Sequence, residues 1–145
     1  MNLITKLAYN ALTKTIQAIA PGGVSIALGT SESGRYLPTL TGVSNIAAAV
    51  PYASSYIRVA NIVTVSGYME VDLTTASVAS ELRISLPIPS NLSAYTDCAG
   101  AVSGGGVMTA TNLVGDAANN TALLQFTNTS ASNIGYSYVF QYEIK

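Results

Sequence analysis

The side chains best suited to chemistry in this sequence are its seven acids, because it contains no histidine. Glu70 and Asp72 stand two residues apart in an alternating stretch. Their side chains should therefore project from the same face of the strand expected there. Such a pair could act as acid and base or hold calcium. Because both acids alternate with apolar residues, we expect them to lie on a solvated strand face instead.

The other polar motifs are better explained by turns than by sites. Asp116 opens a run with too few acids for a calcium loop, which is typical of an Asx turn. Gly104-Gly105-Gly106 lacks the following helix and lysine of a phosphate loop, and favours a hairpin turn or a point where two chain segments cross. Cys98, the only cysteine, can form no intrachain disulfide and has no histidine to activate it. We therefore predict that the protein is not an enzyme and has no catalytic residue, no cofactor and no metal site.

Alternating aromatic residues near the C-terminus allow two interpretations. They are Tyr136, Tyr138, Phe140 and Tyr142. One interpretation is a platform on which sugars stack, and the other is a core that also forms the interface between subunits. Tyrosine suits both, because it has an apolar body and a hydrogen-bonding tip. We favour the core or oligomer interface, since these positions continue the inward alternation of a strand.

The composition is poor in charge, with 49% hydrophobic and only 9% charged residues, where about 25% charged is usual. The six basic residues are scattered and the net charge is −1, which leaves no electrostatic basis for nucleic-acid binding. No polybasic segment and no run of about 18 apolar residues occurs, so we expect no membrane partner. A surface rich in Ser, Thr, Asn, Gly and Tyr can form protein contacts without stripping many ions of water, which favours an assembly component.

Residues 1–22 are predicted to form a separate N-terminal helix or attachment arm. Within residues 2–19, apolar side chains recur at steps of three and four, with Asn2 as a candidate N-cap and Pro21 as a stop. This amphipathic helix could pack on its own domain, associate with its copies or dock as an arm. The apolar side chains that would attach such an arm are Leu3, Ile4, Leu7, Leu12 and Ile16.

Residues 23–145 are predicted to form one all-β domain. Its clearest strand has one apolar face, formed by Val63, Val65, Gly67, Met69 and Val71. Residues 82–86, 122–126 and 138–144 alternate in the same way, and Gly, Asn, Ser and Pro separate the strands. This spacing indicates an antiparallel β-sandwich, a jelly roll or a small barrel. No helices lie between the strands, which argues against a parallel α/β fold.

Several stretches together resemble a β-domain of tailed-bacteriophage virion proteins, found at tail-fibre tips, in head fibres and as small stand-alone virion proteins. The matching stretches are residues 34–45, 56–67, 86–91, 104–106, 116–126 and 140–144. The resemblance covers residues 24–145 and rests on loose, turn-dominated motifs. At Ala60 similar sequences often have glycine, so an alanine there would be strained if the backbone needs positive φ. The resemblance implies a sandwich or jelly-roll domain, commonly trimeric, without catalytic residues.

The expected function is that of a capsid decoration (cement) or head-fibre protein, made in the host cytoplasm and located in the virion. Its partners would be its own copies in a homotrimer and the major capsid protein or other virion proteins. The short segment before the β-domain favours the capsid over the tail, because a tail fibre needs a long shaft. The alternative is a receptor-binding tip of a tail fibre or spike, which would recognise a host surface glycan.

Overall fold

The computed structural model describes residues 6–10, 15–19, 25–106 and 108–145, and these residues form an all-β fold. Twelve strands make up one antiparallel sheet, and the only helix among the described residues is the short 3-10 helix η1 at Tyr95–Asp97. The strands are β1 (Lys6–Asn10), β2 (Thr15–Ile19), β3 (Ser25–Tyr36), β4 (Leu40–Ser44), β5 (Ile46–Pro51), β6 (Ser54–Val59), β7 (Ile62–Leu73), β8 (Ser80–Ser85), β9 (Cys98–Gly104), β10 (Met108–Asp116), β11 (Thr121–Asn128) and β12 (Ile134–Glu143).

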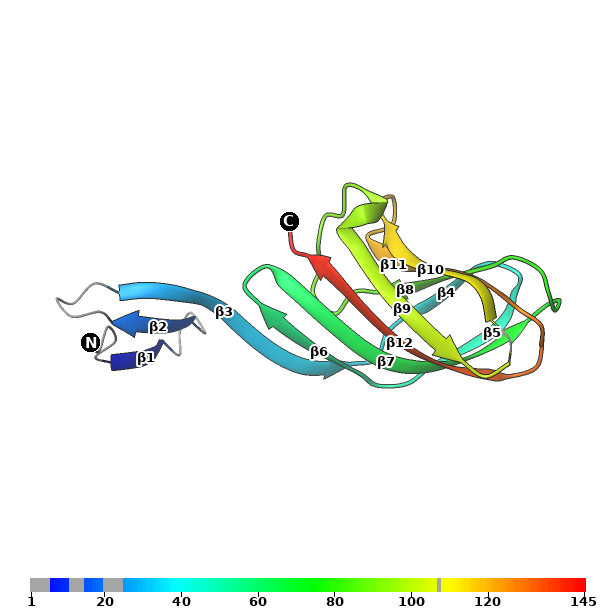
Figure 1. The fold of residues 1–145 in the computed structure, drawn as a ribbon, viewed down its shortest axis with the longest axis horizontal. Coiled ribbons are helices and arrows are strands. Elements are labelled where there is room, and N and C mark those ends of the chain that lie inside the picture. The colour runs from blue at the N-terminus through cyan, green and yellow to red at the C-terminus, as the bar shows by residue number, and fades with distance from the viewer. Residues whose placement is uncertain (1–5, 11–14, 20–24, 107) are drawn as a thin grey trace.

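The sheet curls into a half-barrel. Its order is β1-β2-β3-β6-β7-β12-β9-β10-β11-β8-β4, and β5 pairs with the second half of β7. Since β4 pairs with β8 and runs directly into β5, the chain itself links the far edge of the sheet back to β7 (Figure 1). Asn45 forms this corner with φ of 56°. Its side chain holds the corner by exchanging hydrogen bonds with the backbone of Thr75, at 2.8 and 2.9 Å.

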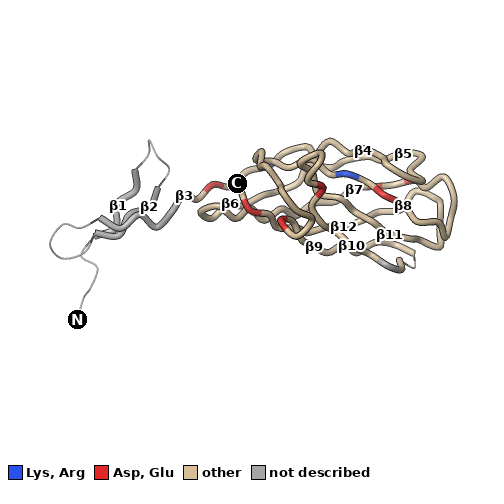
Figure 2. Tube along the Cα trace, turned by 90° about the horizontal axis from the view of Figure 1, so that it is seen from above, with Lys and Arg blue, Asp and Glu red and all other residues tan. Residues whose placement is uncertain are grey.

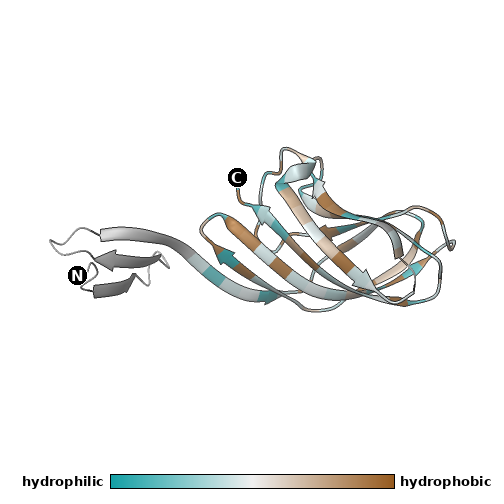
Figure 3. Cartoon of the chain, in the orientation of Figure 1, coloured by the Kyte–Doolittle hydropathy of each residue, from teal (hydrophilic) through white to brown (hydrophobic). Residues whose placement is uncertain are grey.

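The hydrophobic core fills the concave side of the curl. The expected alternation is confirmed on β7, β8, β11 and β12, where alternate residues are buried, apart from the half-buried Gly67. Figure 3 shows apolar and polar residues alternating along β7. The buried apolar residues are Val63, Val65, Met69, Val71, Leu73, Leu82, Ile84, Leu92, Cys98, Leu113, Ala122, Leu124, Phe126, Ile134, Tyr136, Tyr138, Phe140 and Tyr142. Period-two patterning places the remaining side chains of these strands on the convex side, which is the side available to partners.

The predicted N-terminal helix over residues 2–19 is not seen. Its described residues form β1 and β2, which pair with each other from Lys6↔Ile19 to Asn10↔Thr15. β2 then pairs with the first half of β3, whose second half pairs with β6 (Figure 1). An apolar pattern of this length is compatible with two five-residue strands as well as with a helix. The β-branched Thr15, Ile16 and Ile19 favour strands, and pairing with β3 supplies partners that a marginal isolated helix lacks.

Candidate interaction surface

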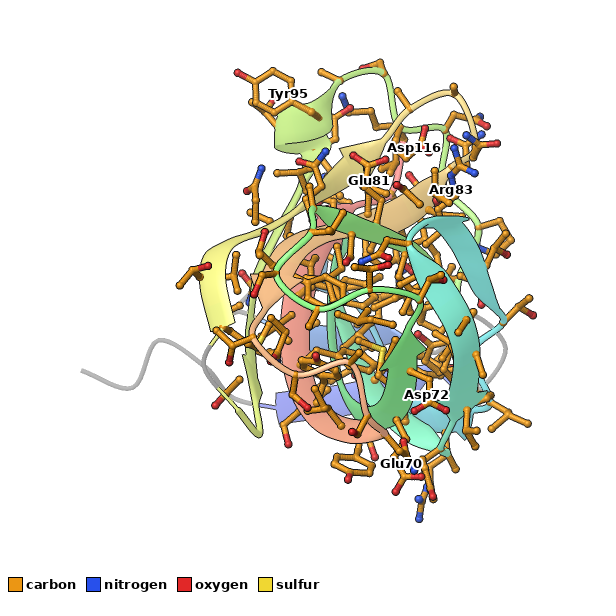
Figure 4. All side chains as sticks on the ribbon, turned by 90° about the vertical axis from the view of Figure 1, so that its right-hand side faces the viewer. Glu70, Asp72, Glu81, Arg83, Tyr95 and Asp116 are labelled. Atoms are coloured by element: carbon orange, nitrogen blue, oxygen red, sulfur yellow. The ribbon has the colours of Figure 1, made fainter. Side chains whose placement is uncertain are left out.

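Glu70 and Asp72 lie on the convex side of β7, as the alternation predicted. Figure 4 shows both acids on the side of the molecule opposite Tyr95, and away from Glu81 and Asp116. Among the described residues no group of three or more histidine, cysteine, aspartate or glutamate side chains could hold a metal ion. In the same part of the chain, no helix has the length and apolarity needed to cross a membrane.

Asp116 forms the predicted Asx turn at the start of the β10–β11 connection. Its Oδ1 accepts hydrogen bonds from the backbone N–H groups of Ala118, at 3.1 Å, and Asn119, at 3.2 Å. Its Oδ2 accepts one from Nε of Arg83 at 2.6 Å. Burial opposes ionisation of this carboxyl, but the bonds from Arg83 and Asn119 hold its pKa below the usual value. The carboxylate is therefore occupied in a structural role.

The glycine run and the lone cysteine have structural roles as well. Gly104 ends β9, where it pairs with Tyr136 of β12, and Gly105 and Gly106 begin the connection to the antiparallel strand β10. β9 and β10 pair only at Ala99 and Gly100, so the glycine run lies in a wide connection and not in a tight hairpin turn. Gly106 has φ of 78°, which favours glycine. Cys98 is buried in the core, and this burial raises the pKa of its thiol to about 12. A thiol with so high a pKa is a poor nucleophile at neutral pH.

The four aromatic side chains predicted as core or oligomer interface lie in the core of the chain itself. Tyr136, Tyr138, Phe140 and Tyr142 are between 0% and 4% exposed. Each hydroxyl has a partner inside the chain: Tyr136 binds Asn128, Tyr138 binds Ser54, and Tyr142 binds the backbone of Ile88. In the single chain these side chains therefore expose almost no area to a sugar or to another subunit.

The attachment residues predicted on the helix are divided between described and undescribed parts of the chain. Leu7 lies on β1 and Ile16 on β2, both within the paired N-terminal strands. Leu3, Ile4 and Leu12 lie outside the described residues. The predicted helical face, which would carry all five side chains, is not seen, because residues 6–10 and 15–19 form strands.

The convex side of four adjacent strands forms a surface of uncharged side chains, which we call the outer face. Charged residues border it: Arg35 pairs with Ser55, and Glu143 pairs with Ile62. It consists of Ser55, Ile57 and Val59 on β6, Ile62, Thr64 and Ser66 on β7, Ser137, Val139 and Gln141 on β12, and Ala99, Ala101 and Ser103 on β9. The strand pairing arranges these side chains in rows across the sheet, such as Ser66, Val139 and Ala101. Figure 2 shows how few charged residues interrupt the sheet.

The outer face exposes more apolar area than its small residues suggest. Ile57 is 51%, Val59 56%, Ile62 43% and Val139 43% exposed. Around Val139, the small side chains of β9 leave two adjoining shallow depressions of about 290 and 340 Å³. Gln141 donates a hydrogen bond to Oγ1 of Thr64 at 2.9 Å. Two polar side chains in the middle of the face therefore bind each other and depend less on water. Such a surface loses little hydration when another surface covers it.

The outer face was not predicted from the sequence, because the outward positions of β7 and β12 also include the acids Glu70, Asp72 and Glu143. The outward positions over residues 62–66 and 137–141 hold no charged residue, but only the strand pairing shows that these two runs are neighbours. In comparisons with known proteins, no protein family, no curated sequence and no solved structure matches this chain. The functional conclusion therefore depends on the residues and their arrangement.

Proposed function

We propose that this protein is a non-enzymatic virion structural protein of a tailed bacteriophage, a capsid decoration or head-fibre protein that acts as a homotrimer. In this proposal the curled sheet is the body of a sandwich or jelly roll, and its partners are its own copies and the major capsid protein. One observation carries it: the outer face is a surface of uncharged side chains on four strands, with charged residues only at its border. The resemblance of residues 24–145 to phage virion domains points the same way.

The outer face is large enough to form the centre of a contact between copies. Strands about 4.8 Å apart and a rise of about 3.4 Å per residue give its twelve residues, three on each of four strands, a footprint on the order of 400 Å². Two patches of this size bury about 800 Å², below the usual range of specific protein interfaces, so the contact in a trimer must include residues around the face. Two copies of one face packed together would close as a dimer, so in the trimer the outer face contacts a different patch of the next copy. Because the outer face itself holds no charged side chain, little ion desolvation opposes its burial.

The work of such a protein is mechanical. A trimer offers three equivalent attachment points, so weak contacts with a capsid add up through effective concentration. In the proposal the N-terminal segment, residues 1–22, makes these contacts. Its described part is a pair of strands, so attachment would use strand pairing or a sheet surface and not the helical face expected from the sequence.

Labelling of purified particles with an antibody against this chain tests the proposal. We expect label over the heads, in many copies on each particle, in electron micrographs. Label confined to tail tips would support the alternative, a receptor-binding tip. If purified particles carry no label while the chain is abundant in infected cells, the virion assignment is wrong.

A further inference from the structure

Two exposed tyrosines lie together at the border of the outer face. Tyr68 is in the middle of β7, where it pairs with Ser137 of that face, and Tyr52 comes directly after β5. The rings of Tyr52 and Tyr68 have centroids 5.2 Å apart and planes at 63°, an edge-to-face arrangement. Their exposed fractions are 42% and 39%, unlike the buried tyrosines of β12. The backbone N–H of Tyr52 donates a hydrogen bond to the carbonyl of Tyr68 at 3.2 Å, which fixes one residue beside the other.

The ring of Tyr68 lies across β12. A Cβ atom added to Gly135 would lie 2.0 Å from the hydroxyl of Tyr68 and 2.7 Å from its Cζ. In the register of β7 and β12, Gly135 pairs with Glu70 and Ser137 pairs with Tyr68. Gly135 and Tyr68 are therefore diagonal neighbours on the same face of the sheet. The absent side chain at Gly135 thus provides the space in which the tyrosine rests against the sheet. One part of the ring covers the backbone of β12, and the exposed part is directed away from it.

Polar groups suited to sugar hydroxyls surround the pair. The nearby Glu70 carboxylate raises the pKa of Tyr52. The Nδ2 of Asn133 donates a hydrogen bond of 3.4 Å to Oε2 of the same carboxylate. A carboxylate with acceptor capacity and an amide with both donor and acceptor groups can bind adjacent hydroxyls. Figure 4 shows Glu70 and Asp72 projecting on this side of the molecule.

We propose that Tyr52, Tyr68, Glu70 and Asn133 form a binding site for a neutral glycan. A β-linked, gluco-configured hexose has axial C–H groups on one face, which would stack on the exposed ring of Tyr68, with Tyr52 as a wall. Its equatorial hydroxyls would bind Glu70 and Asn133. Glu70 and Asp72 carry negative charge, so sugars with a carboxylate are rejected. This inference does not depend on the place of the protein in a particle, but it requires that the tyrosine pair, which borders the outer face, stays exposed in the oligomer.

The test uses the full chain and two soluble probes, chitotetraose and a glucuronate-containing tetrasaccharide of similar size. We expect saturation-transfer NMR to show binding of chitotetraose with a Kd on the order of 1 mM, and weaker binding of the acidic probe. Tyr68→Ala should weaken chitotetraose binding roughly tenfold or more, whereas Tyr68→Phe should retain most of it. Glu70→Gln should reduce the difference in Kd between chitotetraose and the acidic tetrasaccharide. Tyr95→Ala is the matched control, since Tyr95 is 68% exposed on the opposite side of the molecule.

A second variant separates binding from folding. Gly135→Ala retains every aromatic ring but pushes Tyr68 away from β12, so binding should fall several-fold while the circular dichroism spectrum stays that of the parent. The proposal is wrong if neither probe binds the parent chain, or if Tyr95→Ala weakens binding as much as Tyr68→Ala. It is also wrong if Tyr68→Ala leaves sugar binding unchanged and alters the oligomeric mass, because the pair would then belong to a contact between copies.

Discussion

Replacing Ala60 by glycine should stabilise the protein, although the substitution removes a methyl group. Ala60 and Asn61 form the two-residue connection between β6 and β7, and Ala60 has φ of 56° while Asn61 is not in the positive-φ region. Positive φ at the first loop position alone is the pattern of a type II′ turn, in which glycine is preferred. An L-residue in this region costs about 1–2 kcal/mol, and the additional backbone entropy of glycine in the unfolded chain costs about 0.5–1 kcal/mol. The middles of the two ranges differ by about 0.75 kcal/mol, which is the expected gain.

Urea denaturation followed by circular dichroism measures this gain as a higher midpoint at an unchanged slope. The bond that Nε of Arg58 donates to the carbonyl of Ala60, at 2.7 Å, involves the backbone and should survive the substitution. Ala53→Gly is the control, because Ala53 is exposed and has no positive φ, so only the entropic loss should appear. If Ala60→Gly destabilises the protein as much as Ala53→Gly does, the reasoning about strain in this turn is refuted.

Two further predictions concern the packing and charge of the sheet. Asp116→Asn should cost about 1–2 kcal/mol at pH 7, because it removes the charge that Arg83 binds. Because the folded pKa of Asp116 is lowered, this stabilisation is present above the unfolded pKa of about 3.9 and is lost as pH falls through the folded value, so denaturation curves of parent and variant should converge in acid. Gly67→Ala should cost about 1–3 kcal/mol, because the new Cβ would lie 2.1 Å from Oγ of Ser54. Gly105→Ala, whose Cβ would meet only ordinary contacts, should change the unfolding free energy far less, and equal losses in the two variants would contradict the packing argument.

Strand identity and the core could be predicted from the sequence because period-two patterning is local. Val63, Val65, Met69 and Val71 alternate with polar residues, and all four are fully buried. The Asx turn at Asp116 was predictable for the same reason, since its hydrogen bonds reach only two and three residues along the chain. Local rules of this kind need no knowledge of which strands are neighbours.

The N-terminal strands and the outer face could not be predicted in that way. The run that contains Leu7 and Ile16 suits a helix or a hairpin, and only pairing with β3 decides between them. The outer face exists because β9, between residues 98 and 104, pairs with β12 across a long sequence separation. Val139 and Ala101 become neighbours only through that pairing, so no pattern within one strand reveals the surface they share.

The most direct test of the central claim is the mass of the protein in solution when the outer face is given a charge. Val139 on this face and Val78 in the β7–β8 connection are 43% and 44% exposed, which makes them a matched pair. A carboxylate buried without a partner costs about 2–5 kcal/mol at an interface. Light scattering after size exclusion should therefore give a trimer for the parent and for Val78→Glu, and a monomer for Val139→Glu. A parent chain that is monomeric at every concentration, or a Val139→Glu variant that stays trimeric, would contradict the assembly of copies through the outer face.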